Sequence, residues 1–420
     1  MLKLFINAWK VKEIRAKLLY TLLILAIVRL GAHIALPGID LVSIKAGQEM
    51  FGSGTLYNII AGGYNSRFSI FSMGIGPYIT ASIIMQLLTV AIPKIEQLHK
   101  EGEAGRKKIT TYTRYLTIAL SAIQGIGVTA SYSSMFLSDS IFLKIASVIC
   151  LVAGSSFVMW MAEQITQKGL SNGSSMIIFV NIVSNMPSGI SALVSYSQGG
   201  DPVSILKIIA ILLILVVDLV FIVYINQGER RIPVQYSTKM GGRRTFGGQG
   251  SFMPIKVNTA GVIAIIFALS LLQFPEVLSQ FVTPGATYQK VIEVLSISHP
   301  VGAVLYVILI LFFSYFYTSI VINPNEIAEN MKKNGGFIPG IRPGQPTSAF
   351  ITRVVNRITL IGAIVFACVA MVPIVLQWVF GLNVGFGGTT LIIVVGVCLD
   401  LVKSLESQLL MRHYKGFLQN

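Results

Sequence analysis

Ten long apolar runs, separated by short polar segments, dominate this sequence. Each run has roughly the 20 residues that an α-helix needs to cross the hydrocarbon core of a bilayer. The runs cover residues 18–36, 70–91, 112–132, 141–161, 174–195, 205–226, 258–276, 301–322, 355–378 and 388–404. Charged residues make up only 12% of the chain, about half the share in an average soluble domain. The sequence therefore predicts an all-α membrane protein with ten transmembrane helices.

The basic residues alternate between the two sides of the predicted membrane. The chain ends and the connections that follow even-numbered runs contain most of the 32 Lys and Arg residues. Because basic loops stay in the cytoplasm, both termini are predicted to be cytoplasmic. The net charge of +15 is then concentrated on the cytoplasmic face, where it suits anionic lipids, ribosomal RNA or an acidic protein.

The ten runs divide into five before residue 200 and five after it. Because five is odd, the second set crosses the membrane in the opposite direction to the first, as in an inverted repeat. We therefore predict two pseudo-symmetric halves, residues 1–199 and 200–420, with a path or site at the interface between them.

The outer connection 37–69 contains a short apolar stretch between glycines. Its residues are Leu56, Tyr57, Asn58, Ile59, Ile60 and Ala61. The stretch makes about two helical turns, which is too short to span a membrane. These residues alone fit either a re-entrant helix in a protein-lined cavity or a turn on the surface.

Two cytoplasmic connections, 227–257 and 323–352, are longer than the topology requires. In the first, the alternation over 231–236 and the pair Gly241–Gly242 predict a small basic β-hairpin. Its basic residues are Arg230, Arg231, Lys239, Arg243, Arg244 and Lys256. The second connection contains Arg342 between Pro-Gly turns. Long ordered loops commonly contact partners, so we interpret both as docking sites.

Two charged residues, Arg29 and Asp218, lie inside predicted spans. An Arg at the bilayer centre costs roughly 2.5–3.5 kcal/mol on insertion scales, so each side chain should face protein or water. A helix-packing contact, a neutral Asp218, a mutual pair of the two residues, and a place in a cavity lining or ion pathway all fit these residues.

Sequence motifs of soluble enzymes are missing from the chain. There is no Gly-Lys dipeptide and hence no P-loop, and there is no His-Glu-x-x-His or Gly-x-Ser-x-Gly. The histidines are scattered without metal-ligand spacing. We expect no metal, no cofactor and no enzymatic activity, and we favour a channel, transporter or receptor.

The chain resembles the SecY family of bacterial protein-translocation channels, from about residue 10 to its end. The similarity rests on long strings in matching order: Ser69–Thr89, Lys100–Arg106, Glu163–Thr166, Pro254–Asn258, Pro339–Gly344 and Phe386–Thr389. The resemblance implies two five-helix halves around an hourglass pore that passes unfolded secretory polypeptides across the bacterial cytoplasmic membrane.

The resemblance also assigns a ring of side chains at the waist of this pore: Ile75, Ile79, Ser174, Ile178, Ile266 and Ile393. An apolar constriction excludes water and ions while offering few hydrogen bonds to a sliding chain. Ser174 departs from the family pattern, which has an aliphatic residue there, and predicts a slightly wetter or wider waist.

Further positions follow from the same resemblance. The outer stretch resembles a plug helix, at about 51–65, and Thr80, Gln124 and Asn258 resemble the polar cluster of a lateral gate for signal sequences and membrane helices. The basic loops resemble the docking site for the ribosome and the SecA motor ATPase, with Arg342 tied to motor-driven transport. SecE-like and SecG-like small membrane subunits are the implied partners.

Two other functions remain open from the residues alone. A secondary transporter for a small solute would also suit an inverted repeat, but it should show a polar site at the membrane midplane. An intramembrane enzyme would need a catalytic motif that the sequence lacks. A protein-conducting channel is the main hypothesis.

Overall fold

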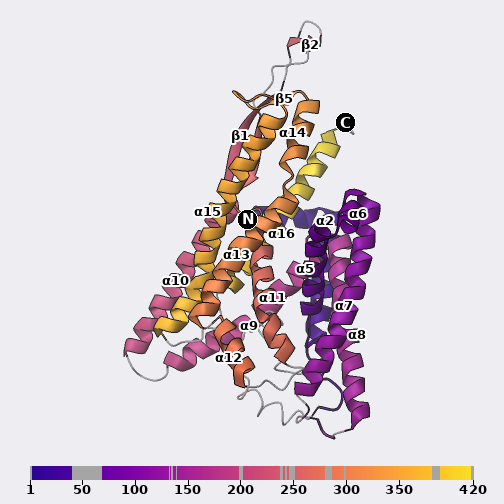
Figure 1. Cartoon of the computed structure of the whole chain (residues 1–420), viewed down its shortest axis with the longest axis vertical. Helices are drawn as coiled ribbons and strands as arrows, with labels where there is room; N and C mark the ends of the chain where they lie inside the picture. The colour runs from indigo at the N-terminus through magenta and orange to yellow at the C-terminus, as the bar shows by residue number, and fades with distance from the viewer. Residues whose placement is uncertain are drawn as a thin grey trace. The chain divides into compact units, whose positions relative to one another are not determined.

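Long α-helices make up most of the computed structural model (Figure 1). The structure describes residues 2–39, 69–131, 133, 136–138, 140–197, 202–236, 240–241, 244–245, 251–279, 286–297, 299–380 and 388–417. Internal contacts divide the chain into two units. Unit 1 combines Met1–Ile208, Gln273–Ile292 and Val379–Asn420, and unit 2 combines Ile209–Leu272 and Glu293–Trp378. The division into halves at residue 199 concerns membrane topology and stays a prediction.

Each predicted apolar run corresponds to a helix in the described residues. The helices that carry the runs are α2 (Lys12–Gly31), α5 (Gly76–Ala91), α7 (Glu103–Ser131), α8 (Ile141–Lys168), α9 (Gly173–Ser197), α10 (Pro202–Gln227), α11 (Gly261–Ser279), α13 (Pro300–Val321), α15 (Gln345–Phe380) and α16 (Gly388–Phe417). The remaining helices are α1 (Leu2–Lys10), α6 (Pro93–Lys100), α12 (Ala286–Leu295) and α14 (Pro324–Lys333). The apolar pattern therefore predicted helix type and position well.

By length and apolar composition, fewer than ten helices qualify as complete membrane spans. In the part of the chain that the structure describes, four helices pass by themselves: Ile141–Lys168, Leu206–Gln227, Pro300–Lys333 and Gln345–Val379. The bent pair α5 and α6 would make a fifth span. The protein is thus a mostly helical membrane protein, and its total of ten spans stays a prediction.

The bend between α5 and α6 measures 100°. It falls at Ile92, whose backbone is extended (φ −114°, ψ 113°), immediately before Pro93. A proline ring disfavours the helical conformation in the residue before it, so the chain must leave the helix there. The bend separates the apolar helix α5 from the short polar helix α6.

Within unit 1, helix α7 packs along both α5 and α8 (Figure 1). Small residues allow this close packing. A Cβ on Gly125 would lie in ordinary contact with Val148 and Leu151, whereas a Cβ on Gly154 would collide with the Ile70 carbonyl oxygen. The lack of a side chain at Gly154 therefore allows the backbone of the segment before α5 to pack closely against α8.

The N-terminal helices contact the last helix in unit 1. Ala8, Ile14, Leu170 and Leu405 form one buried cluster, which joins α1 and α2 to the later part of α16. The Ser404 hydroxyl donates a hydrogen bond to the Leu170 carbonyl oxygen. The N-terminal helices and the last helix thus stabilise each other.

Unit 2 contains a small β-sheet with the strand order β4-β1-β5. Strand β1 (Glu229–Tyr236) pairs antiparallel with β4 (Ser251–Lys256) and with β5 (Gly336–Phe337). Between β1 and β4, the two-residue strands β2 (Met240–Gly241) and β3 (Arg244–Thr245) pair with each other. The predicted hairpin in loop 227–257 is therefore confirmed.

One hydrophobic core joins the loops 227–257 and 323–352. Its buried residues come from β1, β4, α14, the segment after β5, and α15: Ile232, Val234, Ile255, Met331, Ile338, Ile351 and Val355. The sequence predicted two long loops without indicating a contact between them. The structure instead builds them, with the first part of α15, into a single folded layer.

Candidate functional site

Two predicted ring positions lie at the start of α5. Ile75 precedes the helix with a non-helical backbone (φ −92°, ψ 0°) and is 2% exposed. The Ile79 N–H donates to the Ile75 carbonyl oxygen at 3.1 Å, and Ile79 is half-buried. Because residues four apart share a helix face, the two side chains lie on the same side of α5.

The same spacing recurs at the start of α9, where Ser174 and Ile178 share a face. Asn172 precedes the helix, and its Oδ1 accepts hydrogen bonds from the Ser174 N–H at 3.1 Å and from the Ser174 hydroxyl at 2.7 Å. Such bonds satisfy groups at a helix N-terminus that otherwise lack partners. The Ser174 hydroxyl is thus a donor to Asn172, and its place in a pore ring stays a prediction.

The remaining ring positions lie on two other helices. Ile393 is on α16, is 1% exposed and belongs to unit 1, where α16 packs against α9. Ile266 is half-buried on α11 in unit 2. A closed ring requires residues from both units, and it stays a prediction.

The predicted plug, including Leu56, Tyr57, Asn58, Ile59, Ile60 and Ala61, lies outside the described residues.

The predicted gate residues have different hydrogen-bonding states. The Thr80 hydroxyl donates to the Gly76 carbonyl oxygen at 3.2 Å, within α5. Gln124 comes from α7, and its Oε1 is buried without a hydrogen-bond partner among the residues that the structure describes. A buried acceptor that lacks a partner costs about 1–3 kcal/mol, so Gln124 is a polar group available to a ligand or to water.

The third gate residue, Asn258, belongs to a polar pair in unit 2. Its Nδ2 donates to Asn226 Oδ1 at 3.0 Å, and its Oδ1 accepts from the Gly261 N–H at 2.8 Å. These bonds link the end of α10 to the start of α11. Asn226 was not predicted as a site residue, although an Asn at the end of an apolar run is a signal that could have identified it.

A second unpredicted feature is an ion pair between α7 and α8. Arg114 Nε donates to Glu163 Oε1 at 2.9 Å, and Arg114 Nη2 lies 2.7 Å from Glu163 Oε2. The Glu163 side chain is only 10% exposed. A two-point guanidinium–carboxylate contact fixes geometry as well as charge. Glu163 begins one of the strings that resemble the family, but its partner is 49 residues away.

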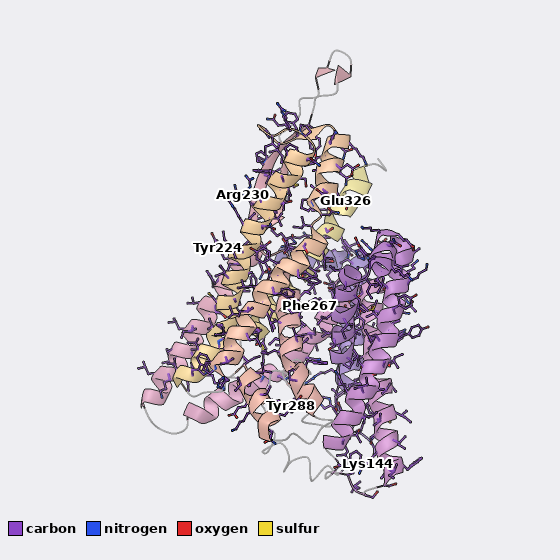
Figure 2. The ribbon with its side chains drawn as sticks, viewed as in Figure 1. Lys144, Tyr224, Arg230, Phe267, Tyr288 and Glu326 are labelled. Atoms are coloured by element: carbon purple, nitrogen blue, oxygen red, sulfur yellow. The ribbon has the colours of Figure 1, made fainter. Side chains whose placement is uncertain are left out.

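The basic residues of the folded layer in unit 2 project from its sheet. Ile232 and Val234 of β1 are buried, while Arg230, Arg231 and Lys256 are exposed. Arg230 on β1 and Glu326 on α14 lie toward the same end of unit 2 (Figure 2). Arg231 Nε donates to Glu229 Oε1 at 2.8 Å, which partly neutralises that charge.

Arg342 lies in an exposed turn after β5. Gly340 and Gly344 on either side adopt positive φ angles of 81° and 107°, which side-chain-bearing residues rarely adopt. The Arg342 carbonyl oxygen accepts from the Thr347 hydroxyl at 2.9 Å. The backbone thus holds Arg342 in a defined loop with its side chain exposed.

The other predicted docking residues are less fully described. Arg244 lies on β3, where its backbone pairs with Gly241, and Lys239 and Arg243 lie outside the described residues.

Comparison with known proteins agrees with this arrangement. The family model of SecY matches residues 69–402. The protein translocase subunit SecY of Streptomyces galbus is 44% identical over 443 residues, which cover 100% of both chains. A solved protein-conducting channel aligns with a TM-score of 0.67 at 19% identity, over 93% of this chain and 91% of that one.

Sec61 from a canine ribosome–channel complex of the endoplasmic reticulum aligns with a TM-score of 0.65 at 18% identity, over 93% of this chain and 91% of that one. At such identities the two solved structures establish the fold. The family-model match and the full-length identity establish membership, and this chain therefore belongs to the SecY family.

Proposed function

We propose that the protein is a channel subunit that passes unfolded secretory polypeptides across the bacterial cytoplasmic membrane. The observation that carries this proposal is the 44% identity, over the full length of both chains, to a protein translocase subunit. The fold of a protein-conducting channel supports it. Basic cytoplasmic loops support an orientation with both termini in the cytoplasm.

The waist of the channel consists of the six ring positions. Two of these positions lie at the start of α5 and two at the start of α9, each pair on one face, so that their side chains, all apolar except Ser174, line the path of the polypeptide. Such a constriction blocks ions when empty because its lining does not replace the hydrogen bonds of water. The plug helix at about 51–65 closes the same path on the outer side.

A lateral gate admits signal sequences and releases membrane helices into the lipid. Gln124 supports this role because its buried Oε1 lacks a partner in the described part of the chain and can accept a hydrogen bond. Asn258 supports it differently, since its bonds to Asn226 and Gly261 hold the start of α11. The side-chain oxygen of Gln124 is therefore available to a ligand, whereas the side-chain amide of Asn258 is already hydrogen-bonded within unit 2.

The cytoplasmic layer of unit 2 docks the partners that deliver the polypeptide. Its shared core makes the hairpin and the Arg342 turn one rigid surface. Exposed basic residues suit ribosomal RNA or an acidic surface of the SecA motor. The motor hydrolyses the nucleotide, and this chain acts without enzymatic activity. SecE-like and SecG-like subunits and anionic lipids complete the assembly.

The test is reconstitution of the purified complex into vesicles with a SecA-type ATPase and a labelled secretory precursor. Protection of the precursor from added protease should require ATP, the motor and an intact signal sequence. If the folded complex protects no precursor but exchanges a small solute, the channel proposal is wrong and a transporter is favoured.

A further inference from the structure

Asp218 lies on the buried face of α10. The buried residues of this helix within unit 2 are Ile211, Asp218, Ile222 and Ile225. Their spacing of seven, four and three residues places them on a single stripe of an α-helix. Leu212, Val216 and Tyr224, off this stripe, are 49%, 62% and 77% exposed, and Figure 2 shows Tyr224 directed away from its helix. Asp218 therefore faces protein rather than lipid.

The environment of this carboxyl group disfavours a negative charge. Asp218 is 5% exposed, and no residue in the described ranges forms a hydrogen bond with its Oδ2. The other residues of the stripe are isoleucines. An ionised carboxylate in such surroundings loses its hydration without gaining a counter-charge, which costs far more than burying the neutral acid.

Charged side chains on the same helix are distant. Lys207 is eleven residues before Asp218, which is about 16 Å along the helix axis at 1.5 Å per residue. The other titratable group on α10 within unit 2 is Tyr224, whose exposed side chain lies off the buried stripe.

The neighbouring helices of unit 2 add no charge at the depth of Asp218. The titratable residues of α13 are Tyr306, Tyr315 and Tyr317, and that helix contains no acidic or basic residue. The only charged residue of α11 is Glu276, which lies in the segment assigned to unit 1. The titratable residues of α15 are Arg353, Arg357 and Cys368.

The two arginines of α15 lie toward the cytoplasm. A Cβ on Gly362 would collide with the Val257 carbonyl oxygen, and the Val257 N–H donates to the Gly228 carbonyl oxygen at 2.9 Å. Gly362 is thus level with the cytoplasmic end of α10, and Arg353 and Arg357 precede it. Asp218 is nine residues, or about 14 Å, deeper than Gln227. Neither arginine can balance its charge.

We propose that Asp218 is a proton-binding site inside the membrane, which holds its proton near neutral pH and reacts with apolar carbodiimides. This inference does not depend on the proposed channel function, because it follows from burial and the surroundings of one carboxyl group.

The reaction consumes the bound proton. The carboxylic acid transfers its proton to one carbodiimide nitrogen, and the carboxylate oxygen attacks the central carbon. One C–O bond forms and one C=N π bond breaks, so the O-acylurea product contains every atom of both reactants. Migration of the acyl group to nitrogen gives a stable N-acylurea. An ionised carboxylate lacks the proton that the first step requires.

The experiment uses the full-length protein, folded in detergent near neutral pH, with dicyclohexylcarbodiimide as the apolar probe. Mass spectrometry should find the adduct on the peptide that contains Asp218 and not on exposed Glu326 or Glu329. A water-soluble carbodiimide should leave Asp218 unmodified. If Asp218 is not labelled under these conditions, the proposal that it is a reactive site is wrong.

Infrared spectroscopy provides a second readout that does not need access of a reagent. The C=O stretch of a protonated carboxylic acid should be present in the parent and lost in Asp218→Asn. The asparagine variant should keep the melting temperature of the parent, since an amide replaces a neutral acid of nearly the same size. If the parent shows no such band, Asp218 is ionised and the proposal is wrong.

Discussion

Arg114 and Glu163 form a two-point ion pair that joins α7 to α8, with contacts of 2.9 and 2.7 Å. Glu163 is nearly buried and Arg114 is partly exposed. The pair fixes α7 against α8 in unit 1, while α5 packs on α7. Helix α5, which carries the predicted ring residue Ile79 and the predicted gate residue Thr80, therefore packs on a helix that is joined to α8 by this ion pair.

Breaking this pair should destabilise unit 1. Glu163→Gln removes the charge but keeps the shape, and it should lower the free energy of unfolding by about 1–3 kcal/mol because a charge-assisted hydrogen bond is lost. Thermal unfolding of the purified complex measures this. The matched control is Glu96→Gln, whose partner Lys100 is 72% exposed and which should cost less than about 1 kcal/mol. Equal effects of the two changes would show that the Arg114 pair has no special role.

The ring can be tested at Ile79 and Ile178. Changing both to Asn should wet the constriction, so ion conductance in a planar bilayer should rise and dependence on a signal sequence should fall. The two sites should differ in stability. Ile178 is 2% exposed, so Ile178→Asn alone should also cost about 1–3 kcal/mol for a buried polar group, whereas half-buried Ile79 should tolerate the change. Lost folding without added leak would assign both residues to ordinary packing.

At the same ring, Ser174→Ile should tighten the seal and reduce residual conductance. Because this change also removes the hydrogen bond to Asn172, Ser174→Ala serves as the control that loses the bond without adding bulk.

Deleting Leu56–Ala61 should leave a folded complex, because the stretch is too short to be a span and is flanked by glycines. The deletion should raise ion leak and permit export of precursors with defective signal sequences. Single-channel recording and an export assay measure these effects. A deletion variant with the conductance of the parent would contradict the plug assignment.

Arg342→Glu should stop motor-driven export while the complex still assembles. Arg342 is exposed in a turn held by backbone contacts, so its side chain contributes little to folding. ATP-dependent precursor protection in vesicles provides the measurement. Lys332→Glu on α14 makes the same charge change in the same loop and should retain most activity. Normal export by a stable Arg342→Glu variant would exclude the assignment.

Charge reversal at both Arg243 and Arg244 should weaken binding to ribosomes by at least tenfold at low salt. Fewer ionic contacts release fewer counterions, so the affinity should also depend less steeply on salt concentration. Sedimentation with ribosomes at several salt concentrations measures both effects. An unchanged affinity and salt slope would place the nucleic-acid contact elsewhere.

The sequence by itself determined the helices and the cytoplasmic hairpin. Apolar runs of about 20 residues predicted a helix at each position, since a segment in lipid must satisfy its own backbone hydrogen bonds. The alternation over 231–236 predicted β1 because side chains on a strand alternate between faces. These features depend on local spacing, which a single sequence displays in full.

Only the tertiary structure decided which distant side chains meet. An apolar run predicts a helix but leaves its rotation against its neighbours unspecified, so it could not pair Arg114 with Glu163 or Asn226 with Asn258. Apolar runs also could not predict that loops 227–257 and 323–352 share one sheet, because β5 is only two residues long and joins the sheet by pairing with β1. Those contacts depend on burying Ile232 and Ile351 in one core, a gain in free energy that exists only once the chain has folded.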